Sequence, residues 1–353
     1  MIKAEENKLN HFLIKEDLDL NNIYNKPFYL IRNGIFNQIE REMLNAGIHN
    51  YFISSKNNLN QMYLNCFFND KVDDNTSNSF EINLKESDFS PWKLLSELNN
   101  KIISDFNLLI SLKTFKVIKK TKKKCVIGEK EKIILKNESS TKIHPGVIFD
   151  TINGPIIIDE NVEIYPFSTL EGPLYIGKNT FIKSARISGG VVIGENCKIS
   201  GEVTNSIIGD YTNKSHEGAL LNSYVGSWCN ISGYTNTANL KLNYTDIILN
   251  NGVTKFRTCN LKLGSIINDY VRLAGGLTMM PGTFVDSCST LTEGSIIKGY
   301  SAPFSYINNS QKYELNIFLS EISKMKQRRN ITMDVHLKNY LNMLFLDNVN
   351  NDK

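Results

Sequence analysis

One histidine lies in a polar stretch whose residue types could do chemistry. The stretch reads NKSHEGALLNSYVGSWCNISGY, and His216 lies two residues after Lys214 and fourteen before Asn230. An imidazole has an ordinary pKa near 6.5, so it can accept a proton as a general base at neutral pH. We therefore take His216 as the candidate catalytic residue.

A second group of polar residues follows further along the chain. Asn243 and Tyr244 offer side chains that form hydrogen bonds, and TKFRT places Lys255 and Arg257 two positions apart. Lysine and arginine both bind phosphate, arginine through two parallel hydrogen bonds. The candidate substrate-binding residues are therefore Lys214, Asn230, Asn243, Tyr244, Lys255 and Arg257.

Aliphatic side chains recur at every sixth position on both sides of these stretches. They are Ile158, Ile164, Leu170, Ile176 and Ile182 before them, and Ile267, Leu273, Met279, Val285, Leu291 and Ile297 after them. This spacing fits neither the period of a helix nor the alternation of an ordinary strand. A six-residue period predicts a β-solenoid, in which each hexapeptide gives one short strand and one inward side chain. A β-sandwich with short strands is the alternative, but its turns would be less regular.

The six-residue period is interrupted between about 237 and 262, and it ends near 300. The interruption predicts a loop that leaves the coils, where functional groups are commonly carried. After residue 300, Leu315, Phe318 and Ile322 lie on one face of a predicted helix, and Leu337 and Leu341 on a second. We expect this helix pair to cover an open end of the solenoid or a neighbouring subunit.

The N-terminal part has a different composition. Glycine is nearly absent before Gly128, which places domain boundaries near 125 and 300. Residues 27–54 predict a strand, a helix capped by Asn33, and a second strand. Ser90 and Pro91 predict the start of a long helix that reaches about Leu109.

Composition excludes several classes of function. The chain has 353 residues, of which 41% are hydrophobic and 22% charged, as in a globular protein. Its net charge of +4 is too small to indicate nucleic-acid binding. It has no apolar run long enough for membrane insertion, no secretory signal and no C-x-x-C pair, so we expect a cytoplasmic protein. The five histidines include no close pair, which argues against a zinc site.

With these patterns in view, the chain resembles a known family, the bifunctional UDP-N-acetylglucosamine pyrophosphorylase/glucosamine-1-phosphate N-acetyltransferases. It is similar above all to their relatives described as sugar nucleotidyltransferases. The motifs that carry the resemblance are NKSHEGALLNSYVGSWCNISGYTN, LNY, TKFRT, FDTINGPIIIDENVEI, SPWKLLSELNNKIISDF and, more faintly, NQIEREMLNAGIHNYFIS.

The resemblance implies a left-handed parallel β-helix over 126–300, with an inserted loop at about 237–262. It also implies a short, reduced nucleotidyltransferase-like α/β domain over 1–125, and the C-terminal helices at 301–353 follow. The implied assembly is a homotrimer. The implied activity is transfer of an acetyl group from acetyl-CoA to an amino-sugar 1-phosphate such as glucosamine-1-phosphate, in the synthesis of nucleotide sugars for the cell envelope. His216 would be the base of that reaction.

Two other functions stay open. A sugar-1-phosphate nucleotidyltransferase would release pyrophosphate from a nucleoside triphosphate and would need Mg²⁺. Against it, the first 33 residues contain no glycine, whereas nucleotide-binding α/β domains usually open with a glycine-rich phosphate loop. A non-catalytic trimeric scaffold is the other alternative, and turnover with any acyl-CoA and amino sugar would exclude it.

Overall fold

A computed structural model describes residues 10–16, 31–46, 51–55, 79–84, 90–111, 125–293, 296–306 and 311–351. The chain divides into two compact units. One contains residues 1–31, 37–90 and 312–353, and the other contains residues 32–36 and 91–311. The helix that precedes the coils groups with them in this division, and the domain boundaries near 125 and 300 stay a prediction.

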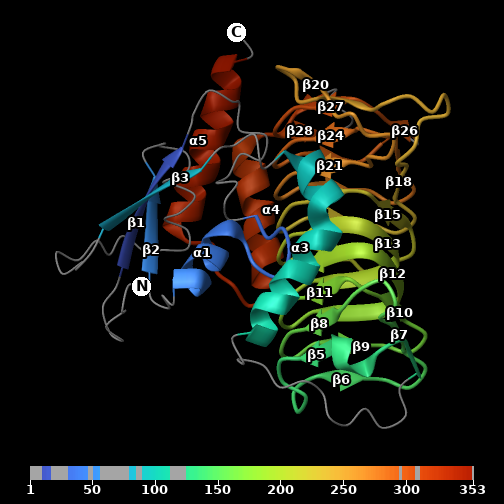
Figure 1. The fold of residues 1–353 in the computed structure, drawn as a ribbon. Coiled ribbons are helices and arrows are strands. Elements are labelled where there is room, and N and C mark those ends of the chain that lie inside the picture. Colours follow the sequence, from blue (N-terminus) through green and yellow to red (C-terminus); the bar gives the residue numbers. More distant parts are fainter. Residues whose placement is uncertain are drawn as a thin grey trace. The chain divides into compact units, whose positions relative to one another are not determined.

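The second unit is a β-helix of about nine coils (Figure 1). Its first strands are β4 (Cys125–Ile127), β5 (Ile133–Leu135), β6 (Lys142–Ile143), β7 (Ile148–Asp150), β8 (Ile156–Ile158), β9 (Glu163–Ile164), β10 (Thr169–Glu171), β11 (Leu174–Ile176), β12 (Phe181–Ile193) and β13 (Lys198–Ile208). The next are β14 (Asn213–Lys214), β15 (Ala219–Leu221), β16 (Tyr224–Val225), β17 (Asn230–Ile231) and β18 (Asn236–Thr237). After the insertion come β21 (Ile266–Ile267), β22 (Arg272–Leu273), β23 (Thr278–Met279), β24 (Phe284–Val285), β25 (Thr290–Leu291), β26 (Ile296–Ile297), β27 (Tyr300–Ser301) and β28 (Ser305–Tyr306).

Parallel pairing between successive coils lines up the inward side chains in three rows. Row A contains Ile143, Ile164, Ile182, Ile199, Lys214, Ile231, Leu273 and Leu291. Row B contains Phe149, Leu170, Ile187, Val203, Leu220, Thr237, Met279 and Ile297. Row C contains Leu135, Ile158, Ile176, Ile193, Ile208, Val225, Ile267, Val285 and Ser301. The β-solenoid predicted from the hexapeptides is confirmed as a parallel β-helix, and so are the helices after it.

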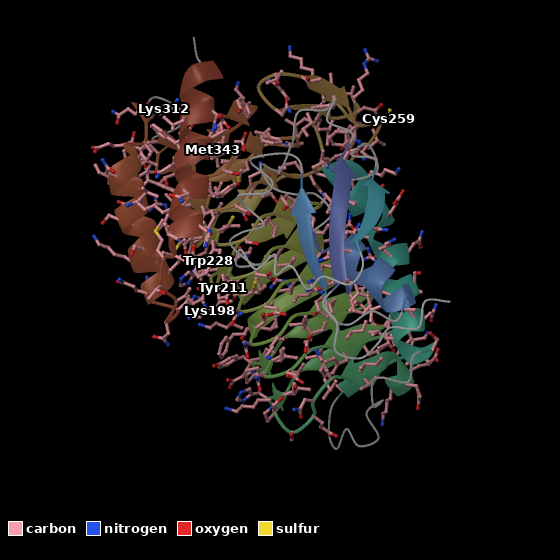
Figure 2. The ribbon with its side chains drawn as sticks, turned by 90° about the vertical axis from the view of Figure 1, so that its left-hand side faces the viewer. Lys198, Tyr211, Trp228, Cys259, Lys312 and Met343 are labelled. Atoms are coloured by element: carbon pink, nitrogen blue, oxygen red, sulfur yellow. The ribbon has the colours of Figure 1, made fainter. Side chains whose placement is uncertain are left out.

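The corners of the tube need residues in the left-handed backbone region. We call the walls of the tube that carry rows A, B and C sides A, B and C. At the corner between sides C and A, one residue of each coil has φ from 56° to 67°. In successive coils these residues are Asn161, Asn179, Asn196, Tyr211, Trp228, Tyr270, Cys288 and Phe304. Asparagine tolerates this region because its amide forms local hydrogen bonds, and here Asn161 donates to Asn179, and Asn179 to Asn196. The aromatic rings that follow stack instead, with Tyr211 and Trp228 centroids 4.3 Å apart (Figure 2).

Helix α3 (Pro91–Ser111) packs along the coils beside β12 and β13. Its start after Ser90 confirms the predicted helix. The short segment 32–36 is fixed to α3 because the buried Asp105 carboxylate accepts the Ile35 backbone N–H at 2.8 Å. The same segment places the Arg32 guanidinium over the Tyr175 ring, 5.4 Å from its centroid.

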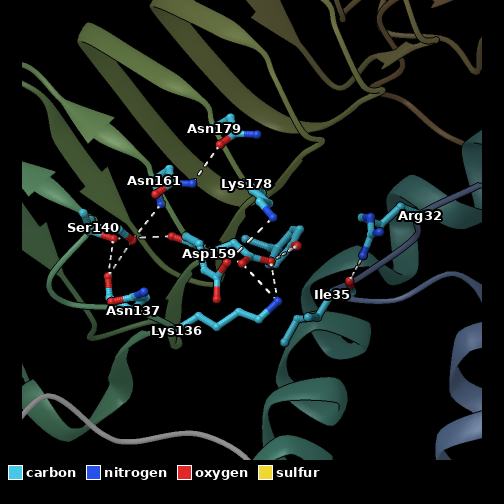
Figure 3. Close-up of polar contacts among 12 residues, drawn as sticks. Arg32, Ile35, Lys136, Asn137, Ser140, Asp159, Asn161, Lys178 and Asn179 are labelled. Atoms are coloured by element: carbon cyan, nitrogen blue, oxygen red, sulfur yellow. Dashed lines mark hydrogen bonds and ion pairs between the residues drawn. The ribbon is translucent and has the colours of Figure 1, made fainter. Parts of the chain in front are cut away.

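A polar cluster lies on the coils next to this segment (Figure 3). The Asp159 carboxylate accepts the Tyr175 hydroxyl at 3.1 Å and pairs with the Lys136 ammonium at 3.1 Å. Burial raises the pKa of Tyr175, so this hydroxyl stays protonated. Burial and the neighbouring Asp210 charge also raise the pKa of Glu195. Because the polar groups of this cluster pair with one another, we assign it a structural role.

The first unit contains a three-stranded parallel sheet in the order β2 (Tyr51–Ser55), β1 (Asn10–Glu16) and β3 (Ser79–Leu84). Helix α1 (Gln38–Ala46) connects β1 to β2. The expected cap at Asn33 is wrong: Asn37 caps α1, because its side chain accepts the Glu40 N–H at 2.9 Å while Glu40 accepts the Asn37 N–H at 2.8 Å. The expected strand near residue 27 lies outside the described residues.

The same unit contains α4 (Leu315–Gln327) and α5 (Val335–Asn351), which contact each other. Phe318, Leu319 and Ile322 are buried on α4, as the helical spacing predicted. On α5, Leu337, Leu341 and Leu344 are buried.

The three rows give a direct test of the fold. Ile193 is fully buried in row C, so Ile193→Ala should lower the free energy of unfolding by about 2–5 kcal/mol, through lost burial and a residual cavity. Ile152 is 65% exposed at a corner, and Ile152→Ala should change stability by less than about 0.5 kcal/mol. Chemical denaturation of both variants measures the difference, and equal losses would contradict the assignment of the rows.

Candidate functional site

His216 lies at the corner where side A turns into side B. It follows row A at Lys214 and precedes row B at Leu220. Its side chain is exposed, whereas the residues two positions before and four positions after it are buried. The coil therefore presents the imidazole to solvent from a fixed backbone.

This corner is longer than the one below it. In the coil below, only Ser200 and Gly201 separate Ile199 from the strand residue Glu202, whereas Ser215 to Gly218 separate Lys214 from Ala219. Two extra residues thus bulge outward at His216 and Glu217, both of which are exposed. The Glu217 carbonyl accepts the Tyr234 N–H at 2.6 Å, which fixes the bulge to the coil above.

The space beside His216 is kept open by glycine. A Cβ placed on Gly233, in the next coil, would lie 3.3 Å from the His216 Cβ. One coil further, Gly275 and Gly276 are exposed, and a Cβ on Gly276 would meet no atom within 4 Å. The imidazole therefore borders a bare strip of backbone along the corner.

Lys214 does not reach this surface. It occupies row A, where the other described members are aliphatic, and its side chain is 2% exposed. Its ammonium donates to the carbonyls of Gly218 at 2.6 Å, Ser200 at 2.7 Å and His216 at 3.4 Å. Burial lowers the pKa of Lys214 from 10.5 to about 8. The prediction that Lys214 binds the substrate is therefore wrong, because its ammonium is buried and donates to backbone carbonyls inside the tube.

Asn230 lies on the outer surface of side A. Its side-chain oxygen accepts the Asn213 amide at 2.8 Å, so the two asparagines form a rung between neighbouring coils. Asn230 is half-buried and precedes Gly233 by three residues. It is thus on the same side of the tube as the approach to His216, and substrate binding by Asn230 stays a prediction.

The interruption of the coils contains a hairpin, β19 (Ile248–Asn250) paired antiparallel with β20 (Lys255–Arg257). Phe256 turns toward α3, where its ring lies 5.3 Å from that of Trp92. Because side chains alternate along a strand, Lys255 and Arg257 point to the opposite face, and both are exposed. Two cations are thus held side by side on an anchored strand.

Asn243 and Tyr244 lie in the turn before this hairpin. The Asn243 side-chain oxygen accepts the Thr245 hydroxyl at 3.0 Å, a contact that shapes the turn. Tyr244 has φ of 53° and is 71% exposed, and Leu242 beside it is 94% exposed. These side chains are open to a ligand or to another chain.

The structure does not bring His216 and the hairpin together within one chain. His216 is at the corner between sides A and B, whereas the insertion leaves after Thr237 of row B and returns before Ile267 of row C. The hairpin packs back on that second corner, since a Cβ on Gly282 would meet the Ile247 side chain. Lys255 and Arg257 therefore lie at a different corner of the tube from His216.

Sequence reasoning missed three features of this region. Lys214 belongs to row A, which only its pairing register with Ile199 and Ile231 shows, because the six-residue period does not connect these positions. The glycine strip, the open backbone at Gly233, Gly275 and Gly276, was not predicted, because only the stacking of coils brings these glycines next to His216. Arg186, exposed two coils below His216 at the same corner, was not considered because nothing in its local sequence marks it.

Two further findings concern the described residues only. Within them, no three His, Cys, Asp or Glu side chains are grouped so that they could hold a metal ion. None of the helices in the described ranges has the length and apolar character needed to cross a membrane.

The fold and corner geometry define a class, the hexapeptide β-helix proteins with an interrupted coil. Comparison with known proteins adds particular relatives. No family model matches the chain. It is 33% identical over 150 residues to the bifunctional protein GlmU of Methanococcus vannielii. The matched region covers 42% of this chain and 36% of that protein. The chain thus spans about a third of the length of that relative.

Among solved structures, the polySia-specific acetyltransferase NeuO is similar at 17% identity and a TM-score of 0.33. The match covers 57% of this chain and 94% of that chain.

The buried ammonium predicts how stability depends on pH. Because the pKa of Lys214 is about 8 in the folded protein and 10.5 ordinarily, the unfolded chain binds more protons between these values. The free energy of unfolding should therefore rise through this window relative to that of Lys214→Met, which lacks the titrating group. Denaturation of both proteins at pH 7, 8, 9 and 10 measures this, and a constant difference would contradict the shifted pKa.

Proposed function

We propose that this protein is an acetyl-CoA-dependent N-acetyltransferase that acts on an amino-sugar 1-phosphate, with His216 as general base. The observation that carries the proposal is the exposed imidazole on a fixed corner beside open glycine backbone. The choice of a sugar phosphate as acceptor follows the resemblance carried by the motifs around His216 and at TKFRT.

The chemistry needs one proton acceptor. The neutral amine of the sugar attacks the thioester carbonyl carbon and forms the C–N bond. His216 takes the proton that the nitrogen loses, the C–S bond breaks, and the His216 imidazolium returns that proton to the released thiolate of CoA, which restores the neutral imidazole. The glycine strip leaves room for the thioester beside the imidazole.

The acceptor's phosphate needs cations, and the exposed Lys255 and Arg257 are suited to it. Because they lie at another corner of their own chain, we propose a homotrimer in which each hairpin completes the His216 site of a neighbour. A three-sided tube allows a closed threefold arrangement in which all interfaces are equal. The exposed Leu242 and Tyr244 support this contact, because apolar side chains grouped on a surface loop indicate an interface.

The nucleotidyltransferase alternative would reside in the N-terminal residues and would use Mg²⁺. A parallel sheet with α1 between two of its strands is compatible with an α/β domain of this kind. The absence of glycine from residues 1–33 speaks against phosphate binding there. Pyrophosphate release from UTP with a sugar phosphate is the measurement that would favour this alternative.

Removing the base should remove most of the activity. His216→Gln is expected to lower kcat by about 10²–10⁴, the usual contribution of general base catalysis, with thiol release from acetyl-CoA as the assay. His144→Gln is the matched control, since His144 pairs with Glu163 at 2.9 Å several coils away. Equal rates for the His216 variant and the wild-type protein would show that His216 is not the base.

Mixed trimers test whether the site is shared between subunits. His216→Ala and Arg257→Ala should each be nearly inactive when expressed alone. Coexpression should restore about a quarter of the wild-type sites, because with random assembly about one site in four combines both intact residues. Recovery requires that the two residues come from different chains, so a site within one chain would give none.

A further inference from the structure

The buried lysine beneath the His216 corner has no counterpart in its row. Ile199 below and Ile231 above fill the same place with aliphatic side chains, and the row continues so through Leu291. A methionine would fill this volume without bringing a charge into the tube, and buried charges are stabilised only where hydrogen bonds satisfy them. The three backbone carbonyls that accept hydrogen bonds from the ammonium therefore indicate its role.

Those acceptors belong to the two unequal corners. The Ser200 carbonyl comes from the short corner below, and the His216 and Gly218 carbonyls from the long corner itself. The Gly218 carbonyl also accepts the Glu202 backbone N–H at 3.2 Å. The ammonium thus ties both ends of the bulge to the coil beneath it.

Two glycines make this arrangement possible. Gly201 has φ of 74°, and a Cβ there would lie 3.0 Å from the Lys214 Nζ and 2.6 Å from the Gly218 oxygen. Gly218 has φ of 135°, and a Cβ there would lie 2.4 Å from the Thr235 oxygen. Both positions therefore exclude other residues, and the backbone is built closely around the ammonium.

We propose that Lys214 is a positioning residue, whose ammonium ties together the carbonyls of Ser200, His216 and Gly218 and so holds the imidazole of His216 in place. The role assigned to His216 rests on the proposed function, whereas the restraint on the corner does not.

The restraint depends on the charge of Lys214. An ammonium has three N–H donors for three carbonyls, whereas the neutral amine has two donors and directs a lone pair at the third carbonyl. The charges that bear on it are Glu217 on the bulge, Glu202 on the coil below and Arg186 one coil further down. With the pKa of Lys214 at about 8, the corner should loosen as pH rises through that value. Local opening frees the corner carbonyls while the amine stays buried in row A, which leaves an ammonium without acceptors and therefore costs more for the charged than for the neutral amine. Global unfolding instead releases the ammonium into water, so overall stability rises over the same window.

Hydrogen–deuterium exchange measures the corner without any activity assay. In the wild-type protein the amides of Glu202, Ala219 and Tyr234, corrected for intrinsic rates, should exchange about tenfold faster at pH 9.5 than at pH 7. Lys214→Met should show fast exchange at both values. Ile199→Met, a substitution in the same row that removes no hydrogen bond, should behave as wild type.

The outcomes separate this inference from the proposed function. Exchange in Lys214→Met that matches the wild-type protein at pH 7, or wild-type exchange that does not change with pH, would overturn the positioning role even in an active enzyme. If Lys214→Met fails to fold, the wild-type pH series alone decides. Where acyl transfer is measured, the kcat of the wild-type protein should fall as pH rises above 8 and that of Lys214→Met should not; an equal fall in both would also contradict the inference.

Discussion

The register between stacked coils is the constraint on which the rest of this structure depends. Each strand of the tube pairs in parallel with the same side of the next coil, so every coil contributes one inward side chain per side. The interior is lined by buried aliphatic side chains, so an inward side chain must either be apolar or find its hydrogen-bond partners in the coil backbone. Variation is therefore confined to the corners, where residues can be added without a change of register.

The corner between sides A and B shows how such a variation creates a candidate site. Adding two residues above the short Ser200–Gly201 corner exposes His216 and Glu217, but it also leaves carbonyls directed inward. Backbone N–H groups of the neighbouring coils reach only some of them. An inward lysine donates to the His216 and Gly218 carbonyls of this corner and to the Ser200 carbonyl of the corner below, so its three N–H groups match the three carbonyls it meets. The longer corner thus exposes the imidazole of His216 and is held from inside by the buried ammonium of Lys214.

The sequence predicted the parts of the fold that follow from periodicity. Six-residue spacing predicted the three rows, and helical spacing predicted α4 and α5, because burial selects aliphatic side chains at fixed intervals. Lys214 escaped this reasoning because a lysine in a turn-rich stretch is usually solvated, and only the register with Ile199 shows that it points inward. The cap of α1 was misplaced for a similar reason. Both Asn33 and Asn37 can cap a helix, and the reciprocal bond from Glu40 distinguishes them.

The separation of His216 from Lys255 and Arg257 is likewise invisible in the sequence. The residues are close along the chain, but each third of a coil turns the backbone toward another side of the tube. An insertion between rows B and C therefore emerges away from the corner between A and B, whatever its length in residues. The hairpin is not free to swing back, since Phe256 is held against Trp92 and the turn at Gly252 against the Tyr300 ring. Lys255 and Arg257 thus stay fixed outward at the corner between sides B and C of their own chain, while His216 stays at the corner between sides A and B.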